Sequence, residues 1–387
     1  MFEVYAILVV CTLLARYIDQ YTYQRVSDGF EINRLDSSGK IMLLIMTSIM
    51  IWFSGTRTIM NDTGTYLNAF NNYVSSSLSS IDNINWAIGA NPLFEIYLIL
   101  IKTFVSQNGH VMILMTSIIV VCSMISFLQL YSWDFGDSIY FFIATASFAF
   151  TMAAIKQTLA TAIGIWAIPL ILKNKNVQAI SVLLVAMLFH PYVVILFVGF
   201  MFKERKAWDK QVYILVIITI VFCMGFSVFV ERVLHFTELI GDDYSTDWFS
   251  RGTGSSIYRI ISSLILPVFS FIYRRELQEE NNQMLNICVN LSIVSGCMSL
   301  IAGVGGTILF GRIPAYFSVF RCLAFPYVMF QGTKLRDGRE NPWSIIIYLA
   351  FLVYYTAYYK KYFDAWHIGM WDSVYKRIPI SEILFGR

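Results

Sequence analysis

Three side chains with different chemistry occur close together in the stretch RTIMNDTGTYLNAF, residues 57–70. Arg57 carries a guanidinium that grips phosphates or carboxylates, and Asp62 carries a carboxylate that orients a hydroxyl or takes its proton. Tyr66 adds a phenol that both donates and accepts hydrogen bonds. The stretch follows the apolar run IMLLIMTSIMIWFSG, so these groups lie where a hydrophobic segment meets water.

Two charged or polar side chains interrupt long apolar runs, where a charge costs about 2.5–3.5 kcal/mol on insertion scales. His190, in LLVAMLFHPYVVILF, precedes Pro191, which removes a backbone donor and kinks a helix. The imidazole either bonds a carbonyl freed by that kink, or it accepts a proton or binds a polar substrate. Arg321 lies about ten residues, roughly 15 Å, from either end of its run, which predicts a function or a buried partner.

Arg312 and Tyr316 are four residues apart. On an α-helix they would share a face, as a guanidinium and a phenol would if both gripped one anion or sugar. The alternative for Arg312 is ordinary interfacial anchoring.

Glu95 follows Asn91 and Pro92, which predicts a place in the first turn of a helix. Both a structural role there and a catalytic role remain open. Lys156, in TMAAIKQTLATAIG, falls at a cytoplasmic turn and is expected to anchor it. It would reach an outward cavity only if residues 138–172 were irregular.

The composition identifies the elements that must position these side chains. Of 387 residues, 57% are hydrophobic and 14% are charged, whereas about a quarter of a soluble domain is charged. Apolar runs recur at lengths that cross the bilayer as helices. We predict an all-α, polytopic membrane bundle in a single domain, 1–387, with no separate soluble domain. About twelve helices (10–14) are expected, near 2–18, 40–55, 92–105, 111–131, 138–154, 156–172, 178–202, 211–230, 256–273, 284–309, 313–330 and 343–358.

Lysine and arginine in the loops indicate the orientation. With the N-terminus outside, the basic loops around 25–40, 203–210, 274–275 and 334–339 become cytoplasmic. The long loops at about 56–91 and 231–255 then face outward. Asp62 or Thr63 is a helix N-cap signal, followed by apolar residues at helical spacing, which predicts an interfacial amphipathic helix over about 63–81.

Several function classes find no support in the sequence. There is no long Lys/Arg block for nucleic acid, and the six cysteines lie far apart inside apolar runs, where packing is the expected role. No phosphate-binding loop, hydrolase or metalloprotease motif occurs. We therefore predict no nucleic-acid partner, no metal site and no cofactor.

Five segments in order carry a resemblance to a known family: RTIMNDTGTYLNAF, NPLFEIYLILI, TMAAIKQTLATAIGIWAI, LFHPYVVIL and GRIPAYFSVFRCLAFPY. Over roughly residues 50–330 the chain resembles the EpsG family, the Wzy-like membrane polymerases of bacterial exopolysaccharide, capsule and O-antigen. One position departs from the family pattern. Lys156 stands before Gln157 where an arginine is usual, which keeps the charge but loses the two-pronged grip on phosphate.

The resemblance implies a glycosyltransferase with a GT-C-like architecture in the bacterial plasma membrane and an active site facing outward. Its substrates would be polyprenyl-diphosphate-linked oligosaccharides within the membrane lipid. Polyprenyl (undecaprenyl) diphosphate would be the leaving group, with no metal required. A chain-length regulator and a flippase would be partners. Asp62, His190 and Glu95 are candidate bases. The candidate substrate contacts are Arg57, Tyr66, Lys156, Gln157, Arg312, Tyr316 and Arg321. Three roles remain open for Asp62: it holds Arg57, it orients the acceptor hydroxyl, or it caps a helix.

Three other functions fit a membrane protein of this kind. A flippase for lipid-linked oligosaccharides also needs an outward cavity lined by arginines, but it needs no base. An ion-coupled transporter is expected to show internal repeats, and none is evident. A membrane acyltransferase would use a residue such as His190 at its acyl-donor site.

Overall fold

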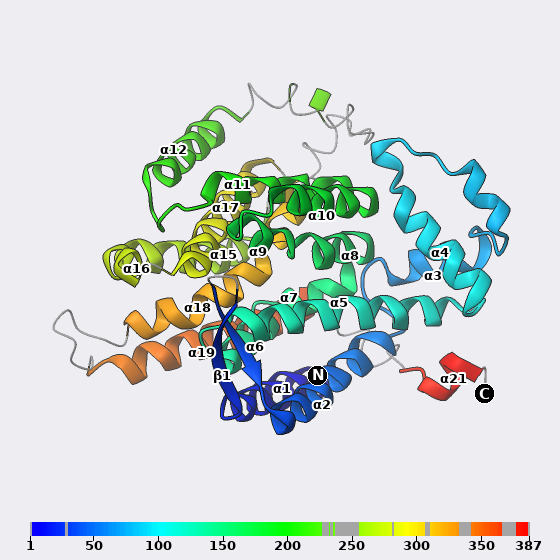
Figure 1. Ribbon diagram of the computed structural model, residues 1–387, viewed down its shortest axis with the longest axis horizontal. Coiled ribbons are helices and arrows are strands. Elements are labelled where there is room, and N and C mark those ends of the chain that lie inside the picture. Colours follow the sequence, from blue (N-terminus) through cyan, green and yellow to red (C-terminus); the bar gives the residue numbers. More distant parts are fainter. Residues whose placement is uncertain are drawn as a thin grey trace.

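The computed structural model (Figure 1) describes residues 2–27, 30–226, 232, 235–236, 255–280, 282–305, 310–332, 342–365 and 377–385. The outward loop predicted at 231–255 lies almost wholly outside these residues. The first half of the described chain comprises α1 (Phe2–Asp19), β1 (Thr22–Ser27), β2 (Phe30–Leu35), α2 (Ser37–Gly55), α3 (Thr63–Asn72), η1 (Leu78–Asn83), η2 (Ile88–Ala90), α4 (Pro92–Phe104), α5 (Gly109–Tyr131), α6 (Phe135–Ala144), α7 (Ser147–Ala153), α8 (Ile155–Gly164) and α9 (Ala167–Leu172).

The second half continues with helices and short 3₁₀ segments. It comprises α10 (Asn176–Phe189), η3 (Pro191–Phe197), α11 (Val198–Phe202), α12 (Lys210–Met224), α15 (Ile257–Ile272), α16 (Arg274–Glu280), α17 (Gln283–Gly305), η4 (Phe310–Phe317), α18 (Ser318–Gly332), α19 (Ser344–Ala365) and α21 (Ile380–Phe385). Every predicted span coincides with a helix or a pair of helices.

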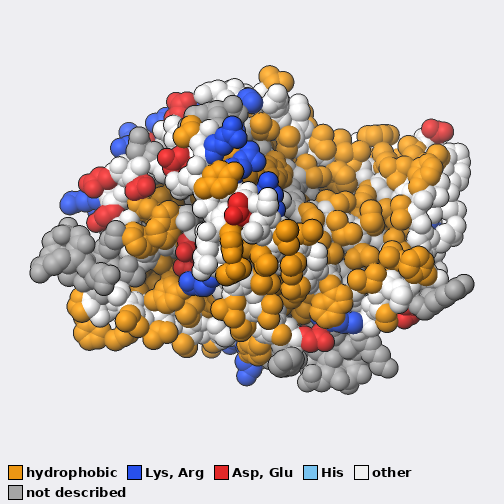
Figure 2. All heavy atoms as spheres, turned by 60° about the horizontal axis from the view of Figure 1, so that its bottom comes forward, with side chains coloured by type: hydrophobic (Ala, Val, Ile, Leu, Met, Phe, Trp, Pro, Cys, Tyr) orange, Lys and Arg blue, Asp and Glu red, His pale blue; other side chains and the backbone are white. Residues whose placement is uncertain are grey.

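Five segments of the described chain are long and apolar enough to cross a membrane: Ser37–Gly55, Gly109–Tyr131, Ile155–Leu172, Gln283–Gly305 and Phe310–Gln331. The number rises to seven if α6 with α7, bent by 50°, and α15 with α16, bent by 73°, each form one span. Figure 2 shows a broad hydrophobic surface with charged side chains gathered mainly toward one end. These features are those of an all-α, multi-pass membrane protein. The count of twelve crossings stays a prediction.

The β1–β2 hairpin defines one end of the bundle, called here the hairpin end. Its strands pair antiparallel from Thr22 with Leu35 to Ser27 with Phe30. Asn33 on β2 donates a hydrogen bond of 2.6 Å to the carbonyl of Ser132, which follows α5. Helix α2 starts beside the hairpin and ends next to Arg57, so it runs from the hairpin end to the end that carries α3, called here the α3 end.

Helix α4 does not cross the bundle, although its sequence predicts a span at 92–105. Near its start, the ring of Phe94 lies 5.8 Å from that of Tyr66 on α3. Near its end, Lys102 donates to the carbonyl of Phe70, also on α3, at 2.6 Å. Because both ends contact one ten-residue helix, α4 stays at the α3 end. It is apolar because it packs against neighbouring helices.

The segment α10–η3–α11 also departs from its predicted single span at 178–202. His190 has an extended backbone and Pro191 begins η3, so the helix breaks there. The chain then returns, because Lys203, just after α11, donates to the side chain of Asn176 at the start of α10 at 3.4 Å. The segment is therefore a re-entrant hairpin with His190 near its tip.

Contacts place the start of α10 and the end of α11 at the end of the molecule that carries the β1–β2 hairpin. Gln278 donates to the carbonyl of Ala207, a few residues after α11, at 2.7 Å. Tyr327 donates to Glu280 at 2.8 Å, and its ring lies 5.8 Å from that of Trp133, next to the β-hairpin contact. Basic residues 203–210 and 274–275 thus gather at the hairpin end, as predicted for one side of the membrane.

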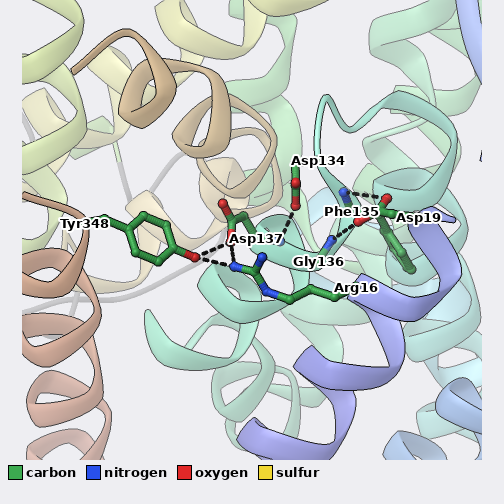
Figure 3. Close-up of polar contacts among 7 residues, drawn as sticks. All are labelled: Arg16, Asp19, Asp134, Phe135, Gly136, Asp137 and Tyr348. Carbon is green, nitrogen blue, oxygen red and sulfur yellow. Dashed lines mark hydrogen bonds and ion pairs between the residues drawn. The ribbon is translucent and has the colours of Figure 1, made fainter. Parts of the chain in front are cut away.

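A polar cluster fixes the hairpin end of α1 against α6 and α19 (Figure 3). Arg16 donates to Asp137 and to Tyr348, and Tyr348 also donates to Asp137 at 2.9 Å. Asp19 accepts from the backbone N–H groups of Phe135 and Gly136 at 3.2 and 2.9 Å, at the start of α6. These contacts hold the helices that carry the break between α6 and α7.

The amphipathic helix predicted over 63–81 is shorter than expected. Helix α3 ends at Asn72, and the 3₁₀ segment η1 follows a break. The break falls in the run SSSLSS, where the N–H of Ser77 donates to the hydroxyl of Ser75 at 3.1 Å. Serine hydroxyls compete for backbone groups in this way and so interrupt helices.

Candidate active site

A cavity with a volume of about 650 Å³ lies at the α3 end. Helix α3, the segment 73–91, α4 and the start of α8 form its walls. Among its lining side chains are four that the sequence singled out: Asp62, Tyr66, Glu95 and Lys156. Residues separated by almost a hundred positions therefore meet in one space large enough for sugar units.

Asp62 joins this cavity to the segment η4. Its carboxylate lies 3.5 Å from Nη2 of Arg312, whose side chain is half exposed. Gln157, on α8, donates from its amide to the backbone carbonyl of Arg312 at 2.7 Å. Asp62 starts α3 without capping it through its side chain, so the carboxylate serves the ion pair. The structure thus brings Asp62, Gln157 and Arg312 together.

Tyr66 and Lys156 form the floor of the cavity with Phe94. The ammonium of Lys156 lies 5.4 Å from the centre of the Phe94 ring, a cation–π contact. Burial raises the pKa of Tyr66 to about 12, and the negative charge of Asp62 contributes in the same direction. The phenol therefore stays neutral and keeps its proton at physiological pH, so it is able to donate to a ligand.

Lys156 lies at the α3 end, whereas the loop alternation predicted a cytoplasmic turn. Two features of the chain explain the difference. Helix α4 does not cross, which shifts the side of the turns between α5 and the re-entrant segment α10–η3–α11, where the alternation is restored. The stretch 135–172 is also broken, at Ala146 with φ 61° and again at Ala154, so α8 begins at the α3 end. Residues 138–172 are therefore irregular, which is the condition under which the sequence allows Lys156 to reach the cavity.

His190 and Tyr316 meet at the tip of the re-entrant hairpin. The Tyr316 hydroxyl lies 2.7 Å from Nδ1 of His190, and both groups are within electrostatic reach of Arg312. The prediction that Arg312 and Tyr316 share a face is wrong, because η4 is a 3₁₀ helix. With 3.0 residues per turn, residues four apart differ by about 120°. Arg312 is exposed, while Tyr316 is buried against His190.

Arg57 lies behind the cavity and is only 2% exposed. Its guanidinium donates to the hydroxyls of Thr63 at 3.2 Å and Ser117 at 3.3 Å and to the carbonyl of Met152 at 3.1 Å. It also donates to the carbonyl of Ser54. These acceptors belong to α2, α3, α5 and α7, so Arg57 ties together the helices that hold the site.

Arg321 does not reach the cavity of Asp62. It lies deep in α18, is 7% exposed, and has a weak contact of 3.5 Å to the hydroxyl of Ser263. The buried partner that its position predicts is therefore a serine.

Sequence reasoning missed Lys102, which is 8% exposed. Its ammonium donates to the carbonyls of Phe70 and Asn71 at 2.6 and 3.0 Å, in the last turn of α3. A cation there satisfies carbonyls that have no partner within the helix and complements the helix dipole. Its place three residues from the end of an apolar run was the available signal, but that position is equally typical of an interfacial anchor.

Lys102→Met is expected to destabilise the protein by about 1–3 kcal/mol, because two buried carbonyls lose their donor. A lower melting temperature in detergent, with α3 and α4 more open to hydrogen exchange, would be the readout. Lys210→Met, at an exposed lysine, is the matched control and should leave both values unchanged. Equal melting temperatures for the two variants would refute the capping role.

The comparison with family models identifies the family of this chain. Residues 40–370 match the model of the EpsG family. The chain belongs to the EpsG family. EpsG proteins are Wzy-like polymerases, and membership indicates a general role in joining polysaccharide repeat units. Comparisons with curated proteins and with solved structures each returned no match.

The match includes all the residues that line the cavity, from Asp62 to Lys156, as well as His190 and Arg312. Within the described part of the chain, no three His, Cys, Asp or Glu side chains are placed to hold a metal ion. Among the described residues, the charged side chains that line the cavity are Asp62, Glu95 and Lys156, and Arg312 lies next to it through its ion pair with Asp62.

Proposed function

We propose that this EpsG protein is a polymerase that joins polyprenyl-diphosphate-linked oligosaccharide repeat units in the cavity at the α3 end. The observation that carries the proposal is the composition of that cavity. Carboxylates at the starts of α3 and α4 and a cation on α8 line a space of about 650 Å³, and Arg312 on η4 forms an ion pair with one of those carboxylates, Asp62. Breaking a sugar–phosphate bond requires a base on one side and positive charge on the other.

In the proposed step, a hydroxyl oxygen of the acceptor sugar bonds to the anomeric carbon of the donor sugar. The bond from that carbon to the diphosphate oxygen breaks, and polyprenyl diphosphate leaves with the electron pair. Glu95 takes the hydroxyl proton: its carboxylate lines the cavity and forms no hydrogen bond or ion pair within the described chain. Arg312 and Lys156 stabilise the charge that develops on the leaving group.

Asn91 supports a sugar as the occupant. Its side-chain oxygen lines the cavity, is buried, and has no hydrogen-bond partner among the described residues. A buried acceptor without a donor costs free energy, and a sugar hydroxyl supplies that donor. The neutral phenol of Tyr66 is the complementary donor. Asp62, held by Arg312, orients that guanidinium, and His190 positions η4 through Tyr316.

The outer face of the bacterial plasma membrane is the proposed side of the reaction, because the basic loops gather at the opposite, hairpin end. A lipid-linked donor fits a cavity beside helices that enter the membrane. A flippase that delivers units to this face and a regulator of chain length are the proposed neighbours.

Purified protein in nanodiscs, given its lipid-linked repeat unit, tests the proposal, since both leaflets are accessible there and relocation leaves no chemical trace. We expect lipid-linked dimers and longer products by mass spectrometry. Units that bind but stay unchanged would replace the polymerase by a flippase. Units that gain only the mass of an acyl group, from an added acyl donor, would replace it by an acyltransferase.

Arg312→Ala is expected to slow elongation by about 10²–10³-fold, the effect of removing one donor that stabilises developing negative charge. Its half-exposed ion pair with Asp62 contributes only about 0–1 kcal/mol to stability, so the fold should survive. Arg312→Lys should recover part of the rate. Arg205→Ala, at an exposed ion pair near the hairpin end, is the control. Full activity in Arg312→Ala would exclude it from the reaction.

A further inference from the structure

A second, smaller cavity lies where α6 and α7 break, between α15, α19 and the junction of η4 with α18. It measures about 40 Å³ and shares no lining residue with the cavity of Asp62. Two arginines, Arg259 and Arg321, line it together with the serines Ser147, Ser263 and Ser318. The described residues that line it include no carboxylate.

The two cations lack a negative partner in the described part of the chain. Arg321 is 7% exposed, and its Nε has no hydrogen-bond partner there. Its one hydrogen bond, to Ser263, is long at 3.5 Å. Arg259, half buried, donates to the backbone carbonyl of Gly311. Buried charges in proteins are normally paired, because an isolated one forfeits its hydration.

The size and the chemistry of the cavity define its ligand. At roughly 10–15 Å³ for each water, the space holds about three waters, which matches one phosphate group and excludes a sugar. Guanidinium groups bind phosphate through charge-assisted hydrogen bonds, and serine hydroxyls donate to its remaining oxygens. A ligand with one oxyanion therefore supplies the negative partner that Arg259 and Arg321 lack among the described residues.

We propose that Arg259 and Arg321 form a binding site for a phosphate group, and that its occupant is the phosphate of a polyprenyl carrier. The phosphate-binding chemistry stands on the two arginines alone. The identity of the carrier rests on the proposed polymerase function, which handles two lipid-linked substrates and therefore needs a second place for a phosphate besides the cavity of Asp62.

The test uses the full-length protein in nanodiscs of phosphatidylcholine, with farnesyl phosphate, farnesol and inorganic phosphate as probes. Native mass spectrometry and thermal shift measure binding. We expect saturable binding of farnesyl phosphate, weakened at least tenfold by Arg259→Gln and by Arg321→Gln and unchanged by Arg205→Gln. Farnesol should not bind. Equally tight binding of inorganic phosphate would keep the site and assign it to a soluble anion. Unchanged affinity in both arginine variants would overturn the site.

A second variant keeps the test informative if Arg321→Gln fails to fold. Ser318 precedes Arg321 by three residues on α18, so the two side chains share a face. Ser318→Asp is expected to supply an internal anion, raise the melting temperature of the empty protein and abolish farnesyl phosphate binding. Ser318→Asn, of the same size without charge, should do neither. Wild-type binding by Ser318→Asp would overturn the proposal.

The two proposals fail in different experiments. If the protein does not elongate its substrate but binds farnesyl phosphate through Arg259 and Arg321, the polymerase proposal is rejected and the phosphate site is kept. Elongation that proceeds while binding ignores both arginines would reject only the site.

Discussion

Glu95→Gln protein is expected to fold normally, to bind its lipid-linked substrate and to elongate about 10²–10⁴-fold more slowly, the usual contribution of a general base. Glutamine keeps the size and hydrogen-bonding ability of the side chain but cannot take a proton. The stability cost should be small, about 0.3–1 kcal/mol, because the residue is exposed to the cavity in the first turn of α4. Initial rates at which two lipid-linked repeat units are joined in nanodiscs measure this reduction in rate.

Asp82→Asn is the matched control for that experiment. Asp82 lies on η1, next to the cavity wall, but does not line the cavity, so its loss should leave the rate unchanged. Asp62→Asn completes the set. Should Glu95→Gln stay near wild-type activity while Asp62→Asn is inactive, the proton acceptor would be Asp62 and not Glu95.

Arg57→Ala is expected to abolish the folded protein rather than only its activity. The guanidinium is buried and serves acceptors on four helices. Breaking such a buried charged network costs about 3–5 kcal/mol, a large part of a typical net stability of about 5–15 kcal/mol. Fluorescence-detected size exclusion should show loss of the monodisperse peak.

Arg57→Lys separates this role from substrate binding. A single ammonium keeps the charge but cannot span the acceptors from Thr63 to Met152, so we expect a folded fraction with a lowered melting temperature. Arg25→Ala, at an exposed arginine on β1, should behave as wild type. A stable Arg57→Ala protein that no longer binds the lipid-linked unit would restore Arg57 as a diphosphate contact.

The sequence predicted the helical membrane architecture well because the signal is local. Each apolar run forms a helix, since a bilayer leaves backbone groups no other partner. The membrane crossings were harder to predict, because an apolar run is equally compatible with a buried helix that stays on one side of the membrane. Helix α4 is such a case, and its error moved Lys156 to the wrong side. The re-entrant segment around His190 is another.

The candidate site was predictable in its residues more than in its geometry. Asp62, Tyr66, Glu95 and Lys156 do meet in one cavity. Their arrangement depends on contacts between distant segments, such as the pair of Asp62 with Arg312, which no local spacing reveals.

Functional and structural arginines look alike in the sequence. The guanidinium of Arg57 is buried among carbonyls and hydroxyls, whereas that of Arg312 is half exposed and pairs with Asp62. Lys102 was missed for the same reason, since its partners are backbone carbonyls of another helix.

The re-entrant segment places the imidazole of His190 against the hydroxyl of Tyr316. Its imidazole holds Tyr316 and thereby fixes η4, the segment that carries Arg312. The broken segment α6–α9 places Lys156 in the cavity wall and Gln157 against the backbone carbonyl of Arg312. Two polar contacts thus tie η4 to the rest of the site, one from Tyr316 to His190 and one from the carbonyl of Arg312 to Gln157.

The most direct test of the central claim is the stoichiometry of the reaction. Purified protein in nanodiscs would receive the lipid-linked repeat unit, and mass spectrometry would count new sugar linkages and released polyprenyl diphosphate in one sample. A polymerase that works as proposed releases one diphosphate for each linkage, and both numbers fall together in Glu95→Gln and Arg312→Ala. Linkages formed without that release, or no linkages from a protein that binds the unit, would contradict the proposal.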